Sequence, residues 1–214
     1  MKIRHLRHKE IDLKKWDDCV RNAINGNAYT LSWYLDIVSP GWEALVDEHY
    51  ETIMPLTWGS KFGTHYLAQP YFAQQLGVFS TLRLTSDTAA NFLEALPKQF
   101  RYIEINLNKY NKAEIPGFEP KRNTTFELDL IYHYDALYGR YSENTRRNLK
   151  KAQENKLEVK LGVTSPNELI QLIQTNIGPK VPALKEVHYN RIRKIITHAI
   201  MNRFGEIFSV YNEQ

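Results

Sequence analysis

Residues 141–152 read Y-S-E-N-T-R-R-N-L-K-K-A, and residues 157–163 read L-E-V-K-L-G-V. The first stretch has the spacing of a helix, which we expect to begin near Tyr134, to break at Gly139 and to end at Asn155. The second stretch alternates with period two and predicts a strand. A helix that leads directly into a strand favours a mixed α/β fold.

The net positive charge of the chain lies in this same segment. The chain has 28 Lys and Arg residues against 24 Asp and Glu residues, a formal charge of +4. Residues 140–160 hold seven basic and three acidic residues, so the rest of the chain carries 21 of each sign. So local an excess indicates an anion site or a solvated helix, and it argues against a general nucleic-acid-binding coat.

Three cations of this segment, Arg146, Arg147 and Lys150, are the candidate anion-binding residues. The functional interpretation is a phosphate clamp, because a guanidinium fork matches two phosphate oxygens at once. The alternative is a solvated helix face compensated by acids elsewhere, and the sequence leaves both open. Nucleic acid is not favoured, because the patch lacks interleaved stacking aromatics.

The first part of the chain predicts a compact mixture of helices and strands. The turn at 59–63 separates two strands of an expected antiparallel meander. After a short initial strand, the predicted elements are helices Asp12–Ala23 and Ser32–Val38, strands Trp42–Val46, Tyr50–Trp58 and Thr64–Phe72, helix Ser86–Phe100, and strands Tyr102–Leu107 and Thr124–Leu130.

Beyond the basic segment we expect helix Asn167–Asn176, helix His188–Phe204 and strand Glu206–Tyr211. The second helix has a broad apolar face that includes Ile192 and Ile196. The last strand has no predicted neighbour in the chain, so we expect an exposed or partner-paired edge. The second unit therefore looks incomplete, and a homodimer or swapped arrangement is expected.

Two features of the sequence resemble known proteins. The order of predicted segments resembles the GNAT acyltransferase fold. The run Thr145–Ala152 fits the pattern T-R-x-N-[IL]-x-K-A, and with the following strand it resembles the opening of the second domain of Fem-type transferases. Those proteins are tandem GNAT-like domains that add amino acids to peptidoglycan precursors. The resemblance implies a complete GNAT-like domain at 1–132 and the beginning of a second at 133–214.

The resemblance also implies a function. It suggests transfer of an acyl or aminoacyl group to an amine acceptor, in a cleft between two GNAT-like domains. Arg146 would contact the diphosphate of a peptidoglycan-precursor-like substrate, or the acceptor would be another small amine. The donor would be acetyl-CoA or another acyl-CoA in the full-length protein, with an aminoacyl-tRNA as a further option.

A second short sequence lies where a GNAT domain carries its pyrophosphate loop, [QR]-x-x-G-x-[GA]. Residues 74–79 read Q-Q-L-G-V-F, so Gln74 and Gly77 match, Val78 lies between them and the last position, and Phe79 departs from the pattern. A large side chain at that last position would obstruct a close backbone approach. The first domain is thus expected to be degenerate, with the acetyl-CoA loop beyond the last residue. A non-catalytic module that binds an anionic ligand or partner is the alternative function.

Several functional classes are disfavoured by composition. Cys19 is the single cysteine, which excludes an internal disulfide framework and a thiolate zinc cluster. The adjacent Asp17 and Asp18 are expected to raise its pKa, which argues against a nucleophile. No histidine set has metal-ligand spacing, and catalytic residues cannot be assigned. No apolar run reaches ~18 residues and no signal peptide is evident, so a reduced, cytoplasmic protein without a membrane span is expected.

Overall fold

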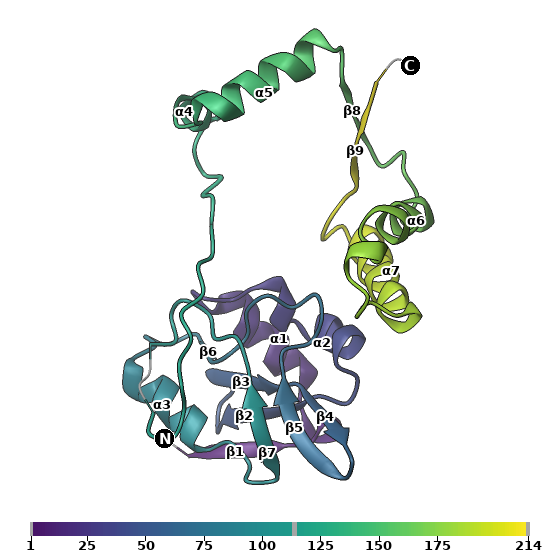
Figure 1. Cartoon of the computed structure of the whole chain (residues 1–214). Coiled ribbons are helices and arrows are strands. Elements are labelled where there is room, and N and C mark those ends of the chain that lie inside the picture. The colour runs from purple at the N-terminus through teal and green to yellow at the C-terminus, as the bar shows by residue number, and fades with distance from the viewer. Residues whose placement is uncertain (1, 113–114, 213–214) are drawn as a thin grey trace. The chain divides into compact units, whose positions relative to one another are not determined.

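The computed structural model of the chain describes residues 2–112 and 115–212 (Figure 1). Helices and strands alternate along it, which confirms the mixed α/β class. The chain divides into two compact units, Met1–Pro120 with Glu186–Ile195 and Lys121–Lys185 with Ile196–Gln214. Helix α7 (Glu186–Met201) contributes to both units.

The first unit contains an antiparallel four-stranded sheet in the order β1-β2-β3-β6. In its central pair, Leu45 lies opposite Met54. Every residue of β2 and β3 is buried, because both faces of these strands are covered. The strands are β1 (Ile3–Leu6), β2 (Glu43–Asp47), β3 (Thr52–Leu56) and β6 (Phe79–Ser80).

A three-stranded sheet follows, in the order β4-β5-β7 (Figure 1). Its strands are β4 (Trp58–Lys61), β5 (Thr64–Ala68) and β7 (Phe100–Glu104). Strand β5 is antiparallel to β4 and parallel to β7. The expected turn at 59–63 is wrong in extent, because β4 continues to Lys61. Gly59 lies opposite Tyr66, whose ring occupies the space that a Cβ at this glycine would fill. Within β4, the glycine therefore makes room for the tyrosine ring of the neighbouring strand.

Helices cover the two faces of the first sheet. On one face, Ala44 and Val46 of β2 share a core cluster with Trp16 of α1 (Leu13–Asn22) and Leu35 of α2 (Ser32–Val38). On the other face, Leu45 packs in a second cluster that includes side chains of α3 (Ser86–Glu94). Alternation along β2 therefore separates the two cores.

Helices α1 and α2 form close to their expected bounds, and α3 starts at its expected residue but is shorter. Asp12 caps α1 by accepting a hydrogen bond from the backbone of Lys15 at 3.1 Å. Helix α3 ends at Glu94, short of the predicted Phe100, because Pro97 cannot continue the helical hydrogen bonds.

The strand expected at Thr124–Leu130 is not formed. The segment is extended and belongs to no helix or strand (Figure 1). Phe126, Leu128 and Leu130 are 92%, 62% and 73% exposed. The prediction is wrong because alternation makes a strand only where a neighbouring strand pairs with it.

The second unit begins with two helices separated at the expected break. Helix α4 (Tyr134–Gly139) ends at Gly139, and α5 (Glu143–Glu154) follows. Ser165 and Pro166 open α6 (Pro166–Asn176), as expected for a capping serine followed by proline. The remaining strands are β8 (Glu158–Leu161) and β9 (Phe208–Tyr211).

The terminal strand does have a neighbour within the chain. Strands β8 and β9 are antiparallel and side by side, with Val159 opposite Val210 and Leu161 opposite Phe208 (Figure 1). The expectation that the chain supplies no partner for this strand is therefore wrong. In the described part of the chain, no helix has the length and apolar character needed to cross a membrane.

Candidate anion-binding site

The basic segment forms α5, whose first turn is fixed by a side-chain cap. The hydroxyl of Ser142 accepts a hydrogen bond from the backbone of Thr145 at 3.2 Å. Three residues, 140–142, separate the end of α4 from the start of α5, and the last of them is the capping serine. Arg146 and Arg147 follow in the first turns of α5, so their positions relative to α4 are set locally by this junction.

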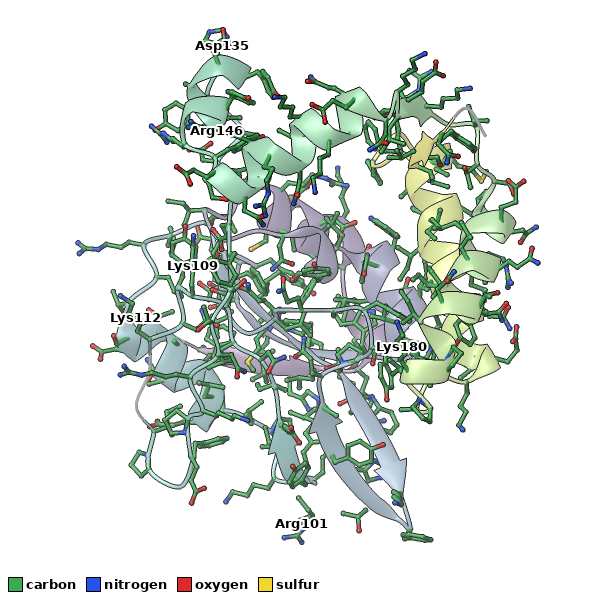
Figure 2. The ribbon with its side chains drawn as sticks, turned by 45° about the horizontal axis from the view of Figure 1, so that its top comes forward. Arg101, Lys109, Lys112, Asp135, Arg146 and Lys180 are labelled. Carbon is green, nitrogen blue, oxygen red and sulfur yellow. The ribbon has the colours of Figure 1, made fainter. Side chains whose placement is uncertain are left out.

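Arg146 lies where the two helices meet (Figure 2). Its Nη2 atom donates a hydrogen bond to the carbonyl oxygen of Gly139, the last residue of α4, at 2.6 Å. Its guanidinium carbon also lies 5.7 Å from the ring centroid of Tyr138. Since a guanidinium has five N–H donors, this orientation leaves donors available to a ligand.

Arg147 and Lys150 complete the cationic face. Arg147 donates to the side-chain oxygen of Asn144 at 2.7 Å. Lys150 lies 3.8 Å from Glu154, and both side chains are largely exposed. In residues 2–112 and 115–212, neither Arg146 nor Arg147 forms an ion pair with a carboxylate. Of these three cations, only Lys150 is therefore paired with an acidic side chain, that of Glu154.

These cations border an open hollow of about 600 Å³ on one side of α4 and α5. Its volume lies in the range of roughly 300–1,000 Å³ that is common for ligand sites. The structure brings Arg146, Arg147 and Lys150 together around this one hollow. The other lining residues are Tyr134, Tyr138, Leu149, Ala152, Gln153 and Leu157.

Sequence reasoning missed the tyrosines of this hollow. Tyr134 and Tyr138 are one helical turn apart, with ring centroids 5.9 Å apart. A further arginine, Arg140, places its guanidinium carbon 4.4 Å from the ring centroid of Tyr132. The statement that the patch lacks interleaved aromatics is thus wrong. The signal was present in the spacing of the tyrosines just before the basic run.

The predicted pyrophosphate-loop residues lie in the other unit. Gln74 is exposed, whereas Gly77 and Val78 are buried. The backbone N–H of Val78 donates to Oδ1 of Asn111 at 2.7 Å. The carbonyl oxygen of Val78 accepts from Nδ2 of Asn25 at 2.8 Å and from Nδ2 of Asn111 at 2.9 Å. The side chain of Asn111 thus occupies the backbone N–H of Val78, the kind of donor that a phosphate would need in such a loop.

Gly77 leaves room for the side chain of Asn111 beside the backbone of Val78. Its φ is +101°, a conformation that favours glycine, and a Cβ at this position would collide with Oδ1 of Asn111. Phe79 is fully buried in the core cluster on the α1 face, within β6. The phenylalanine that breaks the loop pattern is therefore a core residue.

Cys19 is buried beside the first sheet. Burial raises the pKa of its thiol to about 12, with a smaller contribution from Asp47. The direction agrees with the sequence argument, but burial is the main cause and the carboxylate is not one of the two adjacent in sequence. In residues 2–112 and 115–212, no three His, Cys, Asp or Glu side chains are grouped so as to hold a metal ion.

Comparison with known proteins found no match: no family model, no curated protein and no solved structure resembles the chain significantly.

Proposed function

We propose that the α5 face binds a phosphate-bearing ligand, and that the protein takes part in acyl or aminoacyl transfer to an amine. The observation that carries the binding proposal is the pair of adjacent arginines. Arg146 and Arg147 border one hollow, and neither has a carboxylate partner in the described part of the chain. Arginines without acidic partners retain donors for phosphate oxygens.

The transfer proposal rests on the GNAT-like resemblance and is supported by the strand arrangement of the first unit. A GNAT domain has a mixed sheet that splays at its middle strands. Here β5 pairs antiparallel with β4 and parallel with β7, and the register of the β5–β7 pair shifts between His65 and Tyr66. Further along, Leu76 and Leu107 make an isolated parallel bridge. These features are compatible with such a splay.

The chemistry of the proposed transfer suits a chain without an evident nucleophile. An amine can attack a positioned thioester or ester directly, so no covalent enzyme intermediate is needed. Orientation of the substrates and stabilisation of the oxyanion then supply most of the acceleration. In this proposal the arginines hold the phosphate of one substrate, and the donor is an acyl-CoA or an aminoacyl-tRNA.

Binding is tested by calorimetric titration of the chain with inorganic pyrophosphate. We expect Arg146→Gln and Arg147→Gln each to weaken affinity by about tenfold, the effect of losing one charge-assisted contact. Arg101→Gln, at an exposed arginine of β7 in the other unit, is the matched control and should bind as the parent does. Absence of pyrophosphate binding, or equal loss in the control, would refute the proposal.

A non-catalytic binding module is the second candidate. It is favoured by the asparagine contacts that occupy the backbone of Val78 in place of a loop open to a phosphate. Release of free thiol from acetyl-CoA in the presence of a primary amine separates the two functions. Turnover that is lost in the double variant Arg146→Gln/Arg147→Gln supports transfer. Pyrophosphate binding without turnover from acetyl-CoA or an aminoacyl-tRNA supports the binding module.

A further inference from the structure

A row of tyrosine rings runs along α4 and its junction with α5. The ring centroids of Tyr134 and Tyr138 are 5.9 Å apart, and those of Tyr138 and Tyr141 are 5.8 Å apart. Neighbouring rings are tilted by 41° and 57°, so their faces point in different directions. The buried residue of α4 is Leu137, whereas Tyr134 and Tyr138 are 61% and 40% exposed. The packing of α4 therefore rests on Leu137 rather than on these rings.

Arginines accompany this tyrosine row. The guanidinium carbon of Arg146 lies 5.7 Å from the ring centroid of Tyr138, the middle ring. Arg147 borders the same hollow as Tyr134 and Tyr138. Exposed rings beside cations are what single-stranded nucleic acid needs, because unpaired bases stack on the rings while the cations hold the phosphates. The argument from sequence against nucleic acid assumed that such rings were missing.

The acids of the two helices leave the arginines of this row uncompensated. Asp135 lies in the first turn of α4, whereas Arg146 donates to Gly139, the last residue of that helix (Figure 2). Glu154 lies at the end of α5, where it pairs with Lys150. Phosphates bound beside the middle ring would therefore meet guanidinium groups first.

We propose that this tyrosine row and the arginines of α5 bind single-stranded nucleic acid, with unpaired bases on the rings and phosphates on Arg146 and Arg147. The inference rests on the phosphate site proposed above and names its ligand as a nucleotide strand. A duplex does not fit, because its bases already stack on one another and offer no free face. A strand in a duplex rises about 3.4 Å per nucleotide. Rings 5.8 and 5.9 Å apart therefore require a more extended strand with splayed bases.

Oligonucleotides test the inference on the full chain. Fluorescence anisotropy measures the binding of labelled oligo-uridylate and oligo-thymidylate of about eight nucleotides. An abasic strand of the same length supplies the phosphates without bases, and a duplex supplies bases that are already paired. At least one single strand should bind about tenfold more tightly than the abasic strand and the duplex, because each stacked base adds affinity. The comparison of the two single strands identifies RNA or DNA as the source of the ligand.

The results separate this inference from the phosphate site itself. Equal affinity for the single strands and the abasic strand would overturn the inference, and so would tighter binding of the duplex. If inorganic pyrophosphate still binds in either case, the phosphate site stands and only its nucleotide ligand is refuted. Absence of pyrophosphate binding would refute the phosphate site and this inference with it.

Substitution of the middle tyrosine tests the rings. Tyr138→Leu removes the ring from the helix, so oligonucleotide affinity should fall about tenfold. Tyr138→Phe keeps a ring and should bind within about twofold of the parent. Tyr134→Leu is a second, independent loss of a ring with the same expected direction. Affinity for pyrophosphate should change by less than about twofold in all three variants, because the arginines remain.

Tyr110→Leu is the matched control in the other unit. Tyr110 is 41% exposed, and Nζ of Lys109 lies 5.1 Å from its ring centroid. This tyrosine thus has the exposure and the neighbouring cation of Tyr138 while it lies outside the row, and its loss should leave oligonucleotide affinity unchanged. Equal weakening by Tyr110→Leu would overturn the inference. Equal loss of oligonucleotide and pyrophosphate affinity in Tyr138→Leu would also overturn it and would assign this ring to positioning Arg146.

Discussion

The side-chain oxygen of Asn111 lies 2.7 Å from the backbone nitrogen of Val78, and the amide nitrogen of the same side chain lies 2.9 Å from the carbonyl oxygen of Val78. One asparagine thus satisfies both backbone groups of a buried residue, as a neighbouring strand would. The contact joins the segment after β7 to the entrance of β6. It also explains the glycine that precedes Val78.

Gly77→Ala should destabilise the first unit by about 2–4 kcal/mol, since it adds a Cβ both at positive φ and against Asn111. Urea denaturation followed by tryptophan fluorescence measures the change. Gly41→Ala is the matched control, because Gly41 has a φ of +78° with no atom within 4 Å of the added Cβ. It should cost only about 1 kcal/mol. Equal losses would show that the asparagine contact is not the cause.

Asn111→Ala should cost about 1–3 kcal/mol, because the buried N–H of Val78 loses its partner. The double variant Gly77→Ala/Asn111→Ala should lose less than the sum of the two single variants, since the collision disappears with the side chain. A double-mutant cycle in urea measures this coupling. Additive losses would contradict the proposed collision.

Cys19 should react slowly with thiol reagents in the native protein. At about pH 8, its reaction should be at least ~100-fold slower than in denatured chain, because burial suppresses both access and ionisation. Ellman's reagent measures both rates. Fast labelling of the folded chain would contradict the buried environment.

Alkaline pH should destabilise the protein through the same thiol. The unfolded thiol ionises near 9.0 and the folded one near about 12, so stability is complete below the lower value and falls as pH rises between them. Cys19→Ala should reduce this slope without abolishing it, because burial also raises the pKa of Tyr34 to about 12. Denaturation midpoints across this range measure the slope. An unchanged slope would exclude the thiol as a cause.

Glu168 should titrate below the ordinary range of glutamate. The backbone N–H of Ser165 donates to its carboxylate at 2.6 Å, and this hydrogen bond with that to the Ser165 side chain lowers the pKa. The cap therefore stabilises α6 above the ordinary glutamate pKa and is lost as pH falls through the lowered value. Carbon NMR measures the titration. Ser165→Ala should raise the pKa of Glu168 only in part, because the backbone N–H of residue 165 still donates to the carboxylate. An unshifted pKa of Glu168 in the parent protein would contradict the hydrogen-bonded cap.

Local signals predicted the helices well. Ser32–Val38 was predicted and found with the same bounds, and α4 ends at Gly139, where the break was expected. Helical periodicity, caps and breakers act within one or two turns, so a single segment contains them. Helix α3 was predicted too long because its apolar pattern runs on past Glu94 to Pro97.

Strands were less predictable, because a strand depends on its neighbour. Thr124–Leu130 and Glu206–Tyr211 both alternate, yet only the latter segment contributes a paired strand, β9. Both segments have the same alternation of apolar and polar residues. Only the second lies beside another strand, β8, and this pairing joins residues that are distant in sequence.

The amino-acid sequence alone determined the mixed α/β class, the presence of the helices and the concentration of positive charge in residues 140–160, because these depend on composition and local spacing. Only the tertiary structure decided the role of Gly77, whose neighbour Asn111 lies 34 residues further along the chain. It likewise decided that Arg146 reaches the end of α4, bringing cations and tyrosines to one hollow. The role of Gly77 follows from a contact distant in sequence, whereas the position of Arg146 follows from the geometry of the junction between α4 and α5. The same local sequence pattern is compatible with several such arrangements.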